Sequence, residues 1–412
     1  MDMGSLETRA EQFSALVEGQ AMDESGVVRF VLPLPGLEDC APPPSPYPGV
    51  SSADYFPYED SGMATGAYLA AQSLCHLLTG NQTALRRARR AYHGLRHIYR
   101  LGAESVWPGF FPKPFRGGGC RTCSRDQYIF AMSGMREYAP LASASERREI
   151  SEMLSEMAGH WRRIRHCPPL GAPGTPCQLH DYIAGVFLGI QAAPCGDHRD
   201  PAAAECFLRL LAAAHLEETL CDTLRAKFRR GERYDGAQYF RQNENPLMMK
   251  ALTIRQIWEA FPQHRSLCLK AMRNYVRDDL FLELSPMDGL NYYIMRYVPE
   301  TDSLCLAPPG RISSLAASEC FPFLTWGGDR RRAGSTQSAF AAIVASRLLG
   351  EPALAVRARA VLEQLTLDKF RGMSCSSEQD IPPGCEYMSH LLYCNYICFW
   401  LWDYYLLADD RP

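Results

Sequence analysis

Residues 59–101 read EDSGMATGAYLAAQSLCHLLTGNQTALRRARRAYHGLRHIYRL, and this stretch decides the fold class. Apolar side chains recur at helical spacing before the central TGNQT and again after it. A Gly-Asn pair between two periodic runs indicates a turn. The stretch therefore predicts a helical hairpin, with one helix over Glu59–Thr79 and a second over Ala84–Leu101.

The same two-helix unit recurs along the chain. Its spacing, about 40 to 60 residues, is too irregular for a solenoid of short fixed repeats, and alternating strand patterns are almost absent. We predict an all-α protein, with an N-terminal helix and Pro-rich entry segment over residues 1–50 and a single domain over residues 51–412. The further helices are expected at 127–141, 145–165, 180–192, 202–228, 247–261, 266–282, 334–349, 352–367 and 386–407.

The composition excludes several classes of function. The 412 residues are 47% hydrophobic and 22% charged, with a formal net charge of -3, so no basic footprint for nucleic acid or an anionic membrane is present. No segment reaches the ~18 apolar residues of a membrane span. The N-terminus has no apolar core of a signal peptide. We therefore expect a cytoplasmic protein, or a secreted one if the sequence lacks its signal.

Sixteen cysteines are many for a cytosolic protein of this length. Free cysteine is among the most buried residue types, so we interpret most of them as small core residues. A disulfide framework is the alternative. Cys120 and Cys123 form the sole CxxC, and no second pair completes a zinc site at the usual spacing, so we predict no metal and no cofactor. The cysteines on apolar helical stripes are Cys75, Cys206, Cys221, Cys268, Cys394 and Cys398.

Polar, aromatic-rich loops tend to precede the first helix of each hairpin. If the hairpins pack around a ring, these loops collect on one rim and present carboxylates, amides and aromatic rings to one concave face. The loops read YFPYEDSG (55–62), CRTCSRDQ (120–127), PCQLHDY (176–182), YDGAQYFRQNENP (234–246) and ELSPMDGLNYY (283–293).

A ring of helical hairpins with acidic, aromatic loops at one end resembles the six-hairpin, (α/α)6-toroid glycosidases. The hairpin quoted above is similar to one in uncharacterised bacterial members of that superfamily, and so are SRDQYIFAMSGMREY (124–138) and QNENPLMMKALTIRQIWEA (242–260). The resemblance spans residues 55–405 and implies a complete or incomplete (α/α)6 toroid that acts on carbohydrate. The superfamily includes hydrolases, unsaturated-uronyl hydrolases and relatives of polysaccharide lyases, so the resemblance alone assigns no reaction.

Asp126 is the first candidate for catalysis. Ser124 is placed to cap a helix, which puts Asp126 and Gln127 in its first turn, and the preceding glycines allow the backbone to approach a ligand closely. Arg125 is suited to pair with a sugar carboxylate. The alternative is that Asp126 only complements the helix dipole.

Glycoside hydrolysis requires two carboxyl groups, one acting as acid and one as base or nucleophile. The second carboxylate is left open among Asp60, Asp181, Asp235, Asp288 and Glu244. Amide, basic and aromatic side chains in the same loops suit sugar hydroxyls and sugar faces. The predicted substrate-binding residues are Arg125, Gln127, His180, Tyr239, Asn243, Glu244, Asn291 and Tyr292.

The sequence thus predicts a glycoside hydrolase that binds a carbohydrate at one rim of the toroid. A lyase or another uronate-directed enzyme on the same scaffold is the first alternative, since a lyase requires a neutraliser such as Asn243 and a base such as His180, Tyr239 or Tyr292. A non-catalytic helical protein that binds a glycan or a partner is the second. Neither nucleic acid nor membrane is an expected partner.

Overall fold

The chain divides into two compact units. Unit 1 comprises Met1–Ala213 and Tyr387–Pro412, and unit 2 comprises Ala214–Glu386. The single domain over residues 51–412 stays a prediction. The structure, a computed structural model, describes residues 3–29, 32–33, 51, 54, 57–58, 60–115, 123–164, 239–241, 251–252, 254–255, 258–259, 262–276, 294–298, 300–301, 303–306, 339, 341–363 and 387–388.

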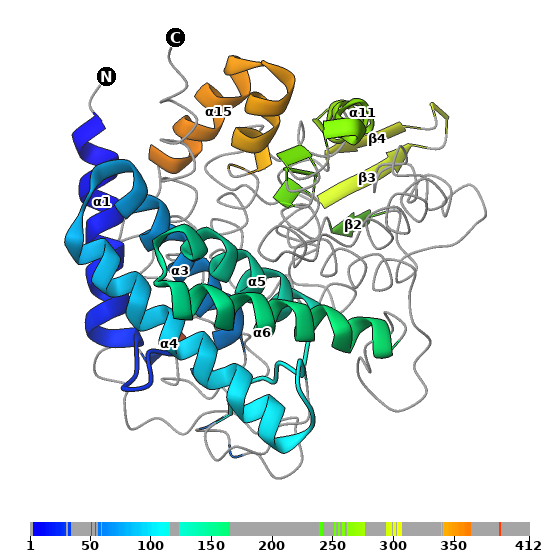
Figure 1. Ribbon diagram of the computed structural model, residues 1–412. Coiled ribbons are helices and arrows are strands. Elements are labelled where there is room, and N and C mark those ends of the chain that lie inside the picture. The colour runs from blue at the N-terminus through cyan, green and yellow to red at the C-terminus, as the bar shows by residue number, and fades with distance from the viewer. Residues whose placement is uncertain are drawn as a thin grey trace. The chain divides into compact units, whose positions relative to one another are not determined.

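Unit 1 is built mainly from helices (Figure 1). Both hairpins predicted between residues 59 and 165 are present, with ends that differ by a few residues from the expected ones. The elements are α1 (Met3–Leu16), the π-helical turn η1 (Val17–Ala21), β1 (Leu32–Pro33), α3 (Ser61–Thr79), α4 (Gln82–Ser105), α5 (Arg125–Tyr138), the 3-10 turn η2 (Ala139–Leu141), α6 (Ala144–Arg163) and β5 (Tyr387–Met388).

The turn between α3 and α4 has the geometry that its sequence predicts. Gly80 ends α3 in the left-handed region, with φ of 69°, where a residue without a Cβ is favoured. The Asn81 side chain then caps α4 by accepting hydrogen bonds from the backbone N–H groups of Thr83 at 2.8 Å and Ala84 at 3.3 Å. Gly80 ends one helix and Asn81 caps the next, so the chain reverses direction between them.

Helix α6 starts at a reciprocal pair of hydrogen bonds. The Ser143 hydroxyl accepts from the Glu146 N–H at 3.2 Å, while the Glu146 carboxylate accepts from the Ser143 N–H at 2.7 Å. This reciprocal pair is a capping box. It satisfies two backbone donors that would otherwise face solvent at the helix end.

Helices α3 and α5 run parallel and in close contact. Gly62 lies beside Gln127 at the start of both helices, and Gly66 lies beside Phe130 and Gly134 one turn further along. Every α3 residue from Ser61 to Cys75 is buried. The helices that follow, α4 and α6, keep charged residues on their outer faces. Each hairpin therefore has one buried helix and one amphipathic helix.

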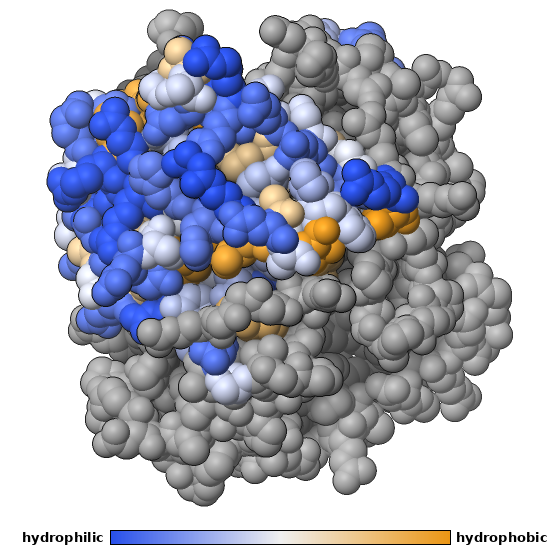
Figure 2. Space-filling view, turned by 60° about the horizontal axis from the view of Figure 1, so that its bottom comes forward, coloured by the Kyte–Doolittle hydropathy of each residue, from blue (hydrophilic) through white to orange (hydrophobic). Residues whose placement is uncertain are grey.

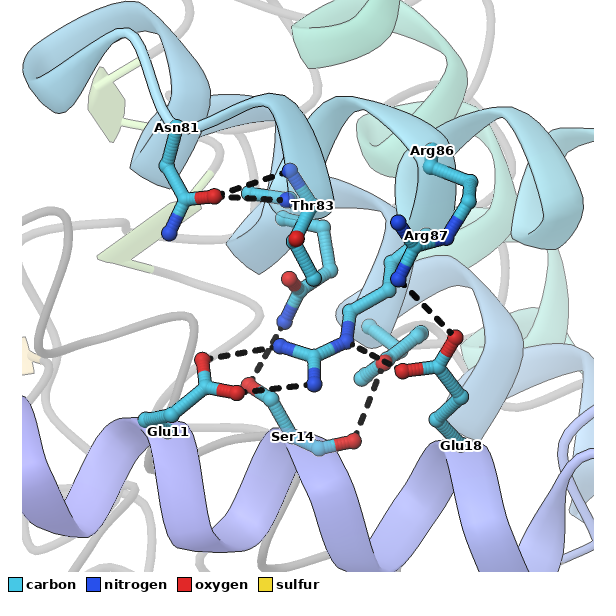
Figure 3. Close-up of polar contacts among 10 residues, drawn as sticks. Glu11, Ser14, Glu18, Asn81, Thr83, Arg86 and Arg87 are labelled. Carbon is cyan, nitrogen blue, oxygen red and sulfur yellow. Dashed lines mark hydrogen bonds and ion pairs between the residues drawn. The ribbon is translucent and has the colours of Figure 1, made fainter.

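The N-terminal helix α1 is held against α4 by a buried arginine (Figure 3). The Arg87 side chain is 5% exposed and points from α4 toward α1, where it forms a two-bond ion pair with Glu11 at 2.8 Å and a bond with Glu18 at 2.7 Å. Burial works to lower the pKa of Arg87, but the bonds with the two glutamates outweigh burial and the pKa ends above its usual value.

Arg87 is the buried arginine of the basic run in α4, and other arginines of the run are exposed. Arg86 is 65% exposed and Arg100 is 53% exposed. The described surface in Figure 2 is predominantly hydrophilic on this face of the molecule. In the part of the chain that the structure describes, no helix is both long enough and apolar enough to cross a bilayer.

Unit 2 contains a small sheet that the sequence analysis missed. Three antiparallel strands lie in the order β2-β3-β4, with Phe240 opposite Met295 and Arg296 opposite Cys305. The described helices of unit 2 include residues 341–349, which precede α15 across a turn at Gly350 with φ of 68°. The elements are β2 (Tyr239–Arg241), the 3-10 turn η4 (Pro262–His264), α11 (Arg265–Tyr275), β3 (Ile294–Val298), β4 (Ser303–Leu306) and α15 (Pro352–Glu363).

The prediction of a mostly helical protein is confirmed for the described residues, while the predicted start of one helix is wrong. The described residues are mostly helical, but they include five short strands, β1 to β5. The helix predicted over residues 386–407 does not begin at Glu386, because Tyr387 and Met388 pair antiparallel with Pro33 and Leu32 in unit 1. Residues 389–407 lie outside the described part of the chain. A two-residue strand is too short to show an alternating pattern of apolar and polar residues. Its partner strand also lies in a distant part of the sequence.

Candidate functional site

The first turns of α3 and α5 meet at one end of unit 1, because the two helices are parallel and in contact. Asp60 occupies the N-cap position of α3, and Asp126 is the second residue of α5. The unpaired N–H groups of two helix starts give this end a positive potential, which favours carboxylates and anionic ligands. Two of the predicted catalytic aspartates thus lie at neighbouring helix ends.

Gln127 joins these two helix ends. Its side chain is completely buried, and its Oε1 accepts a hydrogen bond from the backbone N–H of Gly62 at 3.1 Å. Its Nε2 donates to Oδ1 of Asp60 at 3.2 Å. The amide therefore bridges a backbone donor of α3 and the carboxylate that precedes it.

This bridge changes the role of Asp60. An aspartate at an N-cap ordinarily accepts hydrogen bonds from the second or third backbone N–H of its own helix, but the Asp60 side chain makes no such cap bond. The N–H of Gly62 is satisfied by Gln127 instead. The Asp60 carboxylate is thereby turned toward donors from other segments, and its side chain is 25% exposed.

Lys113 forms an ion pair with Asp60. Its ammonium Nζ lies 3.9 Å from Oδ1 of Asp60, and its side chain is only 8% exposed. Lysine is rarely buried unless it is paired. A carboxylate that faces an ammonium and an amide N–H has the surroundings of an anion, so this arrangement suits a base or a nucleophile better than an acid.

The segment that carries Lys113 is fixed by the aromatic core of α5 and α6. The Tyr128 hydroxyl accepts from the N–H of Phe111 at 2.6 Å and donates to the carbonyl of Gly109 at 3.0 Å. The Trp107 indole N–H donates to Nδ1 of His160 at 2.8 Å. Residues 107–111 are thus tied to α5 and α6, directly before Lys113 in the chain.

His160 is buried and stacks on Tyr128, with ring centroids 5.7 Å apart and planes 8° from parallel. Burial and the charge of Arg163 lower the pKa of His160 to about 4, so the ring is neutral at physiological pH. Because Nδ1 accepts from Trp107, the proton resides on Nε2. Among the described residues, neither this Nε2 nor Nε1 of Trp161 has a hydrogen-bond partner.

A pocket of about 560 Å³ lies in the same unit and is called the α4 pocket here. Its wall includes Tyr58, two residues before Asp60 in the chain, and Pro114 and Phe115, which follow Lys113. Its volume is in the range of small-molecule sites. The lining residues are Met22, Asp23, Glu24, Ser25, Val27, Arg29, Tyr58, Arg90, His97, Leu101, Pro114 and Phe115.

The structure brings together some of the residues predicted from the sequence. Asp60 and Gln127 are in contact, and Arg125 and Asp126 occupy the first turn of the adjacent helix, with only their backbone described. Ser124 sits at the predicted N-cap, but its hydroxyl makes no cap bond. Tyr239 lies in strand β2 and not in a loop. The remaining predicted residues lie outside the described part: His180, Asp181, Asp235, Asn243, Glu244, Asp288, Asn291 and Tyr292.

Lys113 is the residue of this site that sequence analysis missed. Its signal was present in FPKPF (residues 111–115), where a single lysine stands between two prolines and two aromatic residues. Proline fixes the backbone on either side, so a charged residue in this position is presented in one direction. The sequence does not show that the direction is toward Asp60.

The cysteines that the structure describes are buried thiols. Cys75, Cys123 and Cys268 form no disulfide, and burial raises the pKa of the Cys268 thiol to about 12. This confirms the interpretation of Cys75 and Cys268 as core residues. In the described ranges, no group of three or more His, Cys, Asp or Glu side chains is placed to hold a metal ion.

No protein-family model and no curated protein sequence matches the chain. A solved structure of D-mannose isomerase aligns with 96% of this chain and 97% of its own, with a TM-score of 0.50 and 9% sequence identity. At that identity, the similarity shows the fold alone. The described residues are mostly helical, and the fold of the chain is similar to that of this isomerase.

Proposed function

We propose that the chain is a carbohydrate-active enzyme built on an (α/α)6 toroid, with α3 and α5 in its inner ring. The pairing of a buried helix with an amphipathic one in each described hairpin supports this architecture. So does the similarity to D-mannose isomerase over nearly the whole chain. In this proposal the N-terminal ends of α3 and α5 form part of the substrate site at one rim.

The position of Asp60 carries the proposal. Its carboxylate stands at the shared end of two inner helices, is not used as a helix cap, and faces Lys113 and Gln127. Structural aspartates at helix starts cap their own helix. Here a buried glutamine from another helix takes over the capping, which leaves the carboxylate oriented by charged and polar donors, as a catalytic group requires.

Glycoside hydrolysis is the reaction that we propose first. Asp60, held as an anion, would act as base or nucleophile, and Asp126 at the start of α5 would supply the acid. Lys113 and Gln127 are positioning residues in this scheme, since both contact Asp60 through its Oδ1. The amide of Gln127 has both of its ends engaged within the protein, so it fixes Asp60 and does not need to reach the sugar.

Isomerisation of a free sugar is the second candidate, favoured by the similarity to D-mannose isomerase. Moving a carbonyl along a sugar requires a base that removes a proton and an acid that returns one. The carboxylate of Asp60 would act as this base. The two candidates therefore share a residue and differ in whether water enters the product.

The proposal is tested with a panel of oligosaccharides, uronate-containing chains and free aldoses and ketoses, followed by the mass and identity of the products. Products heavier by one water indicate hydrolysis, and a new sugar of unchanged mass indicates isomerisation. Unsaturated fragments would instead establish elimination. Because acid–base groups contribute roughly 10²–10⁴-fold to rate, Asp60→Asn should reduce turnover by at least about a hundredfold.

Asp54→Asn is the matched control, since Asp54 is an aspartate near the same helix whose carboxylate accepts from the Ser51 hydroxyl at 2.6 Å in an exposed turn. This control should keep full activity. Thermal unfolding of both variants shows whether they remain folded. Turnover by a folded Asp60→Asn variant at the wild-type rate would refute the assignment of Asp60.

A further inference from the structure

The α4 pocket is shaped by a preorganised loop. Residues 22–29 are held by the Asp23 carboxylate, whose Oδ1 accepts from the N–H groups of Ser25 at 2.9 Å and Val27 at 3.0 Å. Gly26 has φ of 89° and packs directly on the backbone of α4 at Arg90 and Gly94. A wall fixed in this way loses little conformational entropy when a ligand binds.

Two guanidinium groups on this wall are oriented but not neutralised. Arg90 donates from Nη2 to the backbone carbonyl of Asp23 at 3.0 Å, and Arg29 donates to the backbone carbonyls of Gln20 and Ala21. Neither forms an ion pair with a carboxylate in the described part of the chain. In contrast, Arg86, Arg87, Arg96 and Arg100 of the same helix α4 are each paired with a glutamate.

The carboxylates of the pocket form no ion pair with these two guanidinium groups among the described residues. The Asp23 carboxylate is already occupied by four donors, two backbone N–H groups, the Ser25 hydroxyl at 2.6 Å and the Tyr58 hydroxyl at 3.1 Å. Glu24 is exposed and makes no hydrogen bond or ion pair among the described residues. His97 is likewise exposed on α4 and adds a third nitrogen group to the lining.

We propose that the α4 pocket binds a small phosphorylated sugar. Two guanidinium groups without an ion-pair partner can pair with a phosphate monoester, whose charge is close to −2 at neutral pH, and the planar fork of arginine binds phosphate oxygens through two parallel hydrogen bonds. Glu24 is an acceptor for sugar hydroxyls, and the rings of Tyr58 and Phe115 offer apolar faces for the sugar body. This inference does not depend on the reaction proposed at Asp60.

Direct binding to the intact protein tests the proposal without any need for turnover. Titration calorimetry with glucose 6-phosphate should show saturable binding, while glucose should show none under the same conditions. Arg90→Met should weaken the affinity by about tenfold to a hundredfold, the value of one lost charge-assisted contact. Arg86→Met is the matched control, because Arg86 lies on the same helix outside the pocket, and it should bind like the wild type.

A second variant covers the case in which Arg90→Met loosens the loop. His97 makes no hydrogen bond to the residues that the structure describes, the loop at 22–29 included, so His97→Ala leaves the bonds of that loop in place. It should lower the affinity for glucose 6-phosphate by several-fold. Absence of glucose 6-phosphate binding to the folded wild type would overturn the proposal. So would unchanged binding in both Arg90→Met and His97→Ala, or tighter binding of glucuronate or of inorganic phosphate alone.

Discussion

At the scale of single residues, His160 is the group with the clearest consequence for stability. Its folded pKa is about 4, against 6.5 for an unperturbed histidine. Between these two pH values the unfolded chain binds a proton that the folded chain excludes. The contribution of neutral His160 to stability is therefore full above pH 6.5 and is lost as the pH falls toward 4, with a total loss of about 3 kcal/mol.

We expect this loss to appear as a steeper pH dependence in the wild type than in His160→Gln. Urea unfolding at intervals between pH 4 and 7.5 gives the free energy of unfolding of both proteins. Their difference should change by about 3 kcal/mol across this window. His93→Gln, which removes an exposed histidine of α4, is the matched control. A constant difference between wild type and His160→Gln at every pH would show that His160 is not buried in its neutral form.

Asp60 shows how far single residues are predictable. The sequence nominates Asp60 as a catalytic candidate because it opens a helix in a loop rich in acidic and aromatic residues. It does not nominate Lys113, and it does not show that Gln127 replaces Asp60 as the cap of α3. Both facts depend on contacts between segments more than fifty residues apart.

At the scale of elements, the contact between α3 and α5 depends on glycine. A Cβ on Gly66 would overlap the backbone carbonyl of Phe130 and the N–H of Ala131. Neither atom can give way without moving a helix. We therefore expect Gly66→Ala to reduce the free energy of unfolding by about 3 kcal/mol, at the upper end of the cost of overpacking.

Gly159→Ala is the matched control for Gly66→Ala, because Gly159 also lies inside a helix and has nothing within 4 Å of an added Cβ. Alanine is the better helix former, so this variant should be more stable than the wild type by about 0.5–1 kcal/mol. Urea unfolding monitored by circular dichroism measures both changes. A Gly66→Ala protein as stable as Gly159→Ala would contradict the close parallel packing of α3 and α5.

At the scale of the whole molecule, the open point is whether residues 51–412 unfold as one domain, as the sequence predicts, or as the two compact units. Cys75 and Cys123 are buried in unit 1 and Cys268 is buried in unit 2. Buried thiols react with a labelling reagent only after they are exposed. Their labelling therefore reports the unfolding of each unit separately.

If the chain is one domain, the peptides that contain Cys75, Cys123 and Cys268 should become labelled at the same urea concentration, since a single domain unfolds cooperatively. Mass spectrometry after brief labelling at each urea concentration gives the three midpoints. Cys75 and Cys123 serve as an internal control, because both belong to unit 1 and should agree with each other. A separate midpoint for Cys268 would contradict the single domain.

The sequence by itself determined the features that depend on neighbouring residues. Helical periodicity located α3, α4, α5 and α6, the Gly80-Asn81 pair located the turn, and apolar spacing placed Cys75 and Cys268 in the core. These sequence patterns are local, because an α-helix has a period of 3.6 residues and the type of a turn is determined by two neighbouring residues.

Only the tertiary structure decided the rest. It decided that Arg87 is buried between Glu11 and Glu18, and that Tyr239–Arg241 pairs with Ile294–Val298. It also decided that Gln127 caps α3, so that the Asp60 carboxylate faces Lys113. Each of these contacts joins segments far apart in the chain. Which distant segments meet is set by the packing of whole helices and strands, which no single stretch of sequence contains.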